Sequence, residues 1–91
     1  MISASLVDAN TYEVVVGGAV ESVHRVHMSQ DYYRKLCGAT VTHEWVLIQA
    51  FQFLLEHEPN TAILKEVDLT VVDQYFPEFE HAMAQRFGHH P

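Results

Sequence analysis

Residues 49–80 read QAFQFLLEHEPNTAILKEVDLTVVDQYFPEFE, and this stretch decides the fold of the chain. It is dense in large apolar and aromatic residues. It is interrupted by Pro59 and Pro77, which end or restart helices because proline lacks a backbone N–H and restricts the residue before it. The stretch contains no arrangement of side chains that indicates catalysis. It therefore predicts a packed helical core.

A helix is expected over residues 43–57, which overlaps the start of the quoted stretch, and Thr42 is suited to cap its N-terminus. When its residues are placed about 100° apart around the axis, one narrow stripe is formed by Trp45, Gln49, Gln52 and Glu56. Apolar residues cover nearly all of the remaining surface. We therefore expect this helix to be buried from several sides and to be the central element of the fold.

Further helices are expected toward the C-terminus. Asn60 is suited to cap a short helix near residues 61–66, and the next helix begins at Asp68 or Thr70. Its inward-facing residues are expected to be Val71, Val72, Tyr75 and Phe76. A last helix has an apolar stripe with a spacing of four residues, formed by Phe79, Met83 and Phe87. Gly88 is expected to end it.

The first third of the chain favours strands. Runs rich in β-branched and aromatic residues predict three of them, at residues 2–7, 11–16 and 20–28. The pair Gly17 and Gly18 permits a positive φ and a tight reversal. A short helix follows from the cap residue Ser29 to about Cys37, with Gly38 at its end.

These elements predict an α+β fold, in which an N-terminal antiparallel hairpin or three-stranded sheet packs on three or four C-terminal helices. Ninety-one residues correspond to a single domain over residues 1–91. A domain of this size buries only about 60–65% of its unfolded surface. Because a second copy would cover apolar surface that one chain leaves exposed, we expect a homo-oligomer, most simply a dimer.

The charge is uneven. Residues 41–91 contain eight acids and two bases, and so account for −6 of the net charge of −7. An acidic surface repels phosphate backbones and membrane surfaces, which argues against nucleic-acid and membrane partners. One cysteine excludes an internal disulfide. The sequence lacks a leader pattern and a membrane-spanning run, so a cytoplasmic protein is expected.

No catalytic residue, metal site or cofactor is predicted. Cys37 could be a nucleophile beside His43 or His27, but it lies at the end of a short helix and not at an activating N-terminus. His24 and His27 lie on opposite faces of one predicted strand and cannot chelate an ion together. A single cysteine is also too few for a structural thiolate zinc site. The sequence therefore predicts a protein that is not an enzyme.

Trp45 is the strongest candidate for contact with a partner. It is the only apolar residue on an otherwise polar helical stripe, and tryptophan is enriched at binding hot spots. The alternative is that the strands or the C-terminal helix cover it. Tyr32 and Tyr33 are further candidates, because adjacent helical residues point about 100° apart and are not expected to share one core.

Two resemblances accompany these patterns. The segments FQFLLEHEP, AILKEVDL and QYFPEFE, within residues 49–80, resemble a group of small uncharacterised bacterial proteins. This resemblance covers about a third of the chain and implies no function. Residues 22–58 are similar to the ribbon-helix-helix repressors, including antitoxins. There SVHRVHM would be the strand, SQDYYRKLC the first helix and THEWVLIQAFQFLLEHE the second.

In the ribbon-helix-helix family, strands from two subunits pair and enter the major groove of DNA. The resemblance implies that Arg25 and His27 face the bases, with His24 if the register is shifted by one residue, and that Thr42 marks a phosphate site. The chain departs from that pattern, because a preceding strand at residues 11–16 would pair with the ribbon strand. The expected function is thus a non-enzymatic, self-associating interaction module, with a DNA-binding regulator as the alternative.

Overall fold

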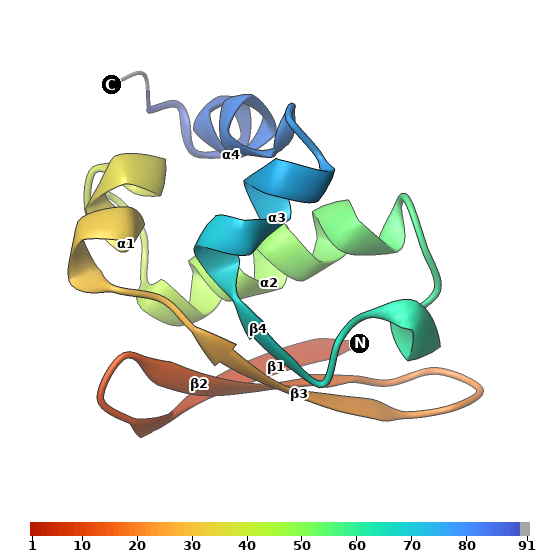
Figure 1. The fold of residues 1–91 in the computed structure, drawn as a ribbon. Coiled ribbons are helices and arrows are strands. Elements are labelled where there is room, and N and C mark those ends of the chain that lie inside the picture. Colours follow the sequence, from red (N-terminus) through yellow and green to blue (C-terminus); the bar gives the residue numbers. More distant parts are fainter. Residues whose placement is uncertain (90–91) are drawn as a thin grey trace.

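Four strands form one sheet, and the four α-helices lie together on one face of it (Figure 1). The computed structural model describes residues 1–89. The strands are β1 (Ile2–Asp8), β2 (Thr11–Val16), β3 (Ser22–His27) and β4 (Glu66–Asp68). They are ordered β1-β2-β3-β4; β1, β2 and β3 pair antiparallel, whereas β4 pairs parallel to β3. The predicted α+β class, with an N-terminal sheet and C-terminal helices, is confirmed.

The helices are α1 (Gln30–Cys37), α2 (His43–Leu55), α3 (Leu69–Tyr75) and α4 (Phe79–Phe87), with a short 3-10 turn, η1 (Asn60–Ala62). The starts of α1 and α2 and the ends of α1 and α4 lie at the predicted cap residues, and α3 begins after Asp68, one of its two predicted starts. The side chains of Ser29, Thr42 and Asp68 each accept a backbone N–H in the first turn of α1, α2 and α3. Gly38 and Gly88 end α1 and α4 with φ of 62° and 65°, which glycine adopts without steric cost.

The core lies between the sheet and the helices, and α2 runs through it. The largest buried side chains of α2 include Leu47, Phe51 and Phe53, which contact the strands on one side and the other helices on the other. Phe79 and Met83 of α4 are fully buried, as the four-residue spacing predicted. The apolar surface of α2 is therefore covered on several sides, as expected for a central helix.

His24 belongs to this core. It lies on the inward face of β3, and its ring packs on Phe51 with 5.2 Å between ring centroids. Its Nδ1 is 2.8 Å from the carbonyl oxygen of Leu64, and its Nε2 is 2.8 Å from Oγ of Ser22. Both nitrogens thus have partners, and the imidazole joins β3 to the segment that leads into β4.

The helix predicted near residues 61–66 is wrong. The chain makes only the turn η1 and then extends into β4, which pairs with β3 from Arg25 to His27. The Asn60 side chain does not cap a helix; it donates to the carbonyl oxygen of Val20 and to Oγ of Ser22. These contacts to a distant strand hold the segment extended, which local propensity cannot reveal.

Smaller differences concern boundaries and loops. The predicted strand over 20–28 is shorter, because residues 17–21 form an open connection, and neither glycine in it has a positive φ. The long helix predicted over 43–57 ends at Leu55. Tyr75, predicted to point inward, is 71% exposed on α3.

We expect His24→Leu to lower the free energy of unfolding by about 1–3 kcal/mol, because the Leu64 carbonyl and the Ser22 hydroxyl would both lose their part-buried contact with the imidazole. Denaturant unfolding measures the change. Arg25→Leu, on the adjacent exposed position of β3, is the control and should change stability by less than about 0.5 kcal/mol. Equal losses in the two variants would show that the imidazole contacts contribute nothing.

Candidate functional site

Trp45 lies in the first turn of α2 and is exposed over 46% of its surface. Its backbone N–H donates to the Thr42 hydroxyl at 3.1 Å, so the cap fixes the position from which the indole projects. Gln52 and Glu56 continue the same exposed stripe. Neither the strands nor α4 buries the indole, and Trp45 remains a candidate for contact with a partner.

Tyr32 and Tyr33 are placed differently from the prediction. Both side chains are buried in the same core cluster, although they were expected not to share one. That expectation was wrong because α1 packs against both α2 and α4 and is buried on two sides. The Tyr32 hydroxyl donates to Oε2 of Glu80 at 3.0 Å, and the Tyr33 hydroxyl donates to the carbonyl oxygen of Val41. These tyrosines hold helices together and present little surface to a partner.

The environment of these phenols stabilises their neutral forms. Burial, followed by the hydrogen bond and negative charge of Glu80, raises the pKa of Tyr32 far above its ordinary value. Burial also raises the pKa of Tyr33, with a smaller contribution from Cys37. Both phenols therefore remain hydrogen-bond donors at neutral pH, which their contacts require.

An unprotected strand edge lies at the side of the sheet formed by β1. In the described part of the chain, β1 has only β2 as a strand partner. Its sequence, ISASLVD, contains no lysine or proline, and its single charge is the terminal Asp8. Proteins normally protect long edge strands with such residues, because free backbone groups pair with another chain. Leu6 is 58% exposed and Val7 is also exposed.

The beginning of α2 adjoins this edge. Leu6 of β1 and Glu44 of α2 line the same shallow cavity, and α2 packs on β1. Ile48, one turn further, is half-buried. Leu6, Val7, Trp45 and Ile48, together with the free edge of β1, define what we call the β1 surface. It combines unpaired backbone groups with exposed apolar side chains.

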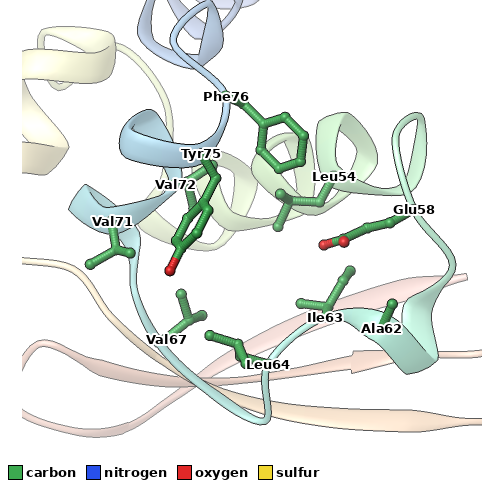
Figure 2. Close-up of a pocket in the computed structure, with 10 residues that line it drawn as sticks. All are labelled: Leu54, Glu58, Ala62, Ile63, Leu64, Val67, Val71, Val72, Tyr75 and Phe76. Atoms are coloured by element: carbon green, nitrogen blue, oxygen red, sulfur yellow. The ribbon is translucent and has the colours of Figure 1, made fainter.

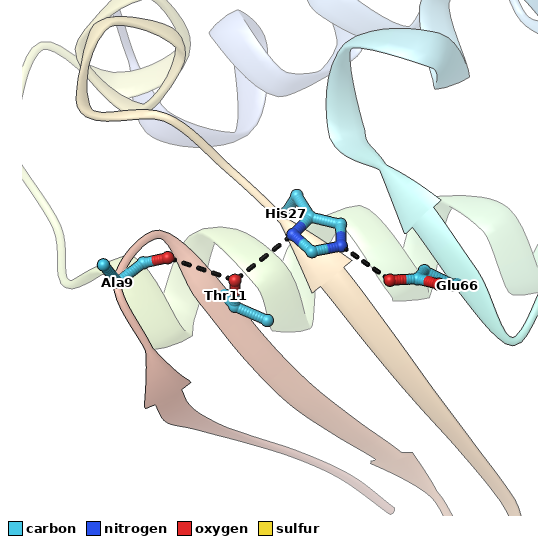
Figure 3. Close-up of polar contacts among 4 residues, drawn as sticks. All are labelled: Ala9, Thr11, His27 and Glu66. Carbon is cyan, nitrogen blue, oxygen red and sulfur yellow. Dashed lines mark hydrogen bonds and ion pairs between the residues drawn. The ribbon is translucent and has the colours of Figure 1, made fainter.

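The face of the sheet opposite the helices carries a row of polar contacts (Figure 3). Nδ1 of His27 lies 3.2 Å from Oγ1 of Thr11, and Nε2 lies 2.9 Å from Oε2 of Glu66. The Thr11 hydroxyl also lies within donating distance of the Ala9 carbonyl, at 3.1 Å. The row joins β2, β3 and β4, and two of its members, His27 and Glu66, are 39 residues apart in sequence.

Hydroxyl, imidazole and carboxylate stand here in the order of a nucleophile, a base and its orienting acid. A nucleophile must reach its substrate, whereas Thr11 is only 8% exposed. Its hydroxyl donates its single proton to the Ala9 carbonyl, so toward the imidazole its oxygen would accept, which is the opposite of what a base requires. The arrangement is suited to holding strands together and not to attack on a substrate.

The residues that the ribbon-helix-helix resemblance assigned to DNA do not form one surface. His24 is buried, whereas Arg25 and His27 lie on the open face of the sheet. His24 and His27 therefore lie on opposite faces, as predicted. β3 pairs with β2 along its length and with β4 from Arg25 to His27, so a ribbon formed with a second copy along the whole of β3 would have to displace β4. Thr42 caps α2 with its side chain.

Cys37 is fully buried, and its thiol donates to the carbonyl oxygen of Tyr33 at 3.4 Å. Among residues 1–89, no three histidine, cysteine or acidic side chains are grouped to hold a metal ion. Within the same residues, no helix has the length and apolar character needed to cross a membrane. No family model, curated protein or solved structure matches the chain.

The raised pKa of Tyr32 predicts a loss of stability at high pH. Above the ordinary value of 10.0 the unfolded chain loses this phenolic proton while the folded chain keeps it, so unfolding is favoured by up to about 1.4 kcal/mol per pH unit for this group. We expect Tyr32→Phe to reduce the slope of stability against pH above that value. Denaturant unfolding at a series of alkaline pH values measures it, and parallel curves for the two proteins would contradict the assignment.

Proposed function

We propose that this protein is a non-enzymatic, self-associating interaction module that acts in the cytoplasm, and that two copies meet through the β1 surface. The free edge of β1 carries the proposal. Alternate residues of this seven-residue strand direct their backbone N–H and C=O groups away from β2 and so offer them to another chain, and no charge interrupts them before Asp8. The exposed Leu6 at the edge, and Trp45 in the first turn of α2, the helix that packs over β1, would add apolar contact area.

If β1 paired antiparallel with β1 of a second copy, the free backbone groups of both strands would form equivalent hydrogen bonds. Such pairing is related by a two-fold axis, the commonest symmetry of soluble homodimers. It would join the two four-stranded sheets into one continuous sheet. Because α2 packs over β1, the α2 helices of both copies would lie on the same face near the axis, where Trp45 and Ile48 could be covered.

The ribbon-helix-helix alternative would need a different strand. In that family the paired strand precedes the two helices directly, which corresponds to β3 in this chain. Since β3 already has two neighbours, self-association through β1 is the proposal that the strand order supports. The net charge of −7 also disfavours binding to DNA.

Light scattering after size exclusion should give a molar mass that approaches twice the 10.4 kDa of one chain as concentration rises. We expect the double variant Leu6→Lys, Val7→Lys to remain monomeric over the same range, because two copies would bring like charges together at the edge. Val20→Lys is the control, since Val20 is similarly exposed, at 61%, in the β2–β3 loop. A wild-type protein that is monomeric at all concentrations would refute self-association.

Trp45 is the only tryptophan and reports on its own environment. We expect its fluorescence emission to shift to longer wavelength on dilution, because the indole would return to water when copies separate. Trp45→Ala should weaken association while leaving the unfolding midpoint at low concentration close to that of the wild type. An emission maximum that is independent of concentration in a protein shown to dimerise would exclude Trp45 from the interface.

A further inference from the structure

A groove lined by apolar side chains lies at the other side of the molecule from β1, where α2 ends and α3 begins (Figure 2). Its volume is about 260 Å³. The end of α2, the segment from η1 to β4, and α3 supply the lining residues Leu54, Glu58, Ile63, Leu64, Val72 and Tyr75, among others. β4 is the strand at the opposite end of the sheet from β1. The groove would therefore stay open in a dimer formed through β1.

Glu58 is the only charged residue among those that line the groove. Figure 2 shows its carboxylate turned inward, toward the side chains of the lining. In the described part of the chain it makes no ion pair, whereas Glu56, Glu66 and Glu78 each pair with a base. A half-buried carboxylate beside apolar groups lacks part of its hydration, so it would gain from a cation that enters the groove.

The charge of the surrounding residues is negative, like that of the Glu58 carboxylate. Residues 41–91 contribute −6, and their two bases are Lys65 and Arg86. Arg86 is held by Glu56 at 2.9 Å and by Gln49 at 3.2 Å. Lys65 lies outside the groove and lines a neighbouring cavity with β3. An approaching cation is therefore attracted by the whole C-terminal half of the molecule, and an anion is repelled.

The dimensions and the rim favour a protein segment as the occupant. Pockets for cofactors and drug-sized ligands usually have volumes of about 300–1,000 Å³, and this groove is smaller. It has room for one or two anchoring side chains. Leu64 and Tyr75, which are 59% and 71% exposed, belong to the lining and extend its apolar surface outward. Tyrosine is among the residues most enriched at binding hot spots.

We propose that this groove binds a short segment of another protein that carries large apolar anchor residues next to a lysine or arginine. The anchors enter between Leu54, Ile63 and Val72, and the cation pairs with Glu58. Tyr75 and Leu64 cover the segment from the sides. The proposal does not depend on self-association through β1, because the groove lies at the opposite edge of the sheet, beside β4.

A random dodecapeptide library displayed on phage, selected on the immobilised full-length chain, tests the chemistry without assuming a partner. We expect the recovered peptides to combine large apolar residues with lysine or arginine. A fluorescein-labelled synthetic copy of one such peptide then gives a dissociation constant by anisotropy. Recovery of peptides without a basic residue, or of no binding peptide at all, would overturn the proposal.

Variants locate the site. Glu58→Gln should weaken binding of the peptide about tenfold, and Glu58→Lys should weaken it further because it replaces attraction by repulsion. Tyr75→Ser and Leu64→Ser should also weaken binding while leaving unfolding nearly unchanged, since both side chains are exposed. Val20→Ser is the matched control for Leu64→Ser, because the two residues have similar exposure. Peptide binding that is equal in wild type and Glu58→Lys would refute the site.

Two other occupants would be recognised by the same variants. If a second copy of this chain fills the groove, Tyr75→Ser and Glu58→Lys would lower the molar mass measured by light scattering, and the proposal would fail. If a small amphiphilic amine is the ligand, hexylamine would displace the labelled peptide at millimolar concentration or below. Displacement only by the unlabelled peptide supports a protein segment.

Discussion

The burial of α2 against the sheet is the interaction on which the rest of the structure depends. Phe51 packs on His24 of β3, while Phe53 packs on Phe79 of α4, so a single helix belongs to both halves of the core; Val46 and Leu47 of the same helix are also fully buried. Since a fully buried aliphatic or aromatic side chain contributes about 1.5–3 kcal/mol, these four residues outweigh any polar contact on the surface. The two candidate surfaces lie at the two ends of this helix: the β1 surface includes Trp45 in its first turn, and the groove includes Leu54 in its last.

Much of the fold could be predicted because local signals agree with tertiary packing. The caps at Ser29 and Thr42, and the stops at Gly38 and Gly88, depend on a few neighbouring residues and were predicted correctly, and Asp68 is one of the two starts predicted for α3. β4 could not be predicted in this way. Three residues are too few to show alternation. The segment is held in place by two hydrogen bonds, from Asn60 to Val20 and between His24 and Leu64, and each joins residues that are 40 apart in sequence.

The candidate surfaces were less accessible to sequence reasoning. Trp45 could be singled out because a helical wheel shows an apolar residue among polar ones, and the structure leaves it exposed. Tyr32 and Tyr33 were misjudged because the wheel of one helix does not show that two neighbours cover it. The groove around Glu58 was not predicted at all, since its lining comes from segments that are separated in sequence and nothing near Glu58 in the sequence marks its carboxylate as part of a groove. Tyr75 lines this groove and is exposed, but the sequence analysis assigned it to the core.

The position of β4 has a consequence for the order in which the chain folds. β1, β2 and β3 are joined by short connections, so their pairing encloses few residues and is entropically cheap. β4 reaches β3 only after α1 and α2 have been traversed, and only three residue pairs then form. Of the three strand pairings, that of β3 with β4 therefore closes the longest loop and forms the fewest residue pairs. We expect the amides of β4 to exchange with solvent through partial openings that leave α2 and the first three strands intact, so that the groove beside β4 opens and closes independently of the core.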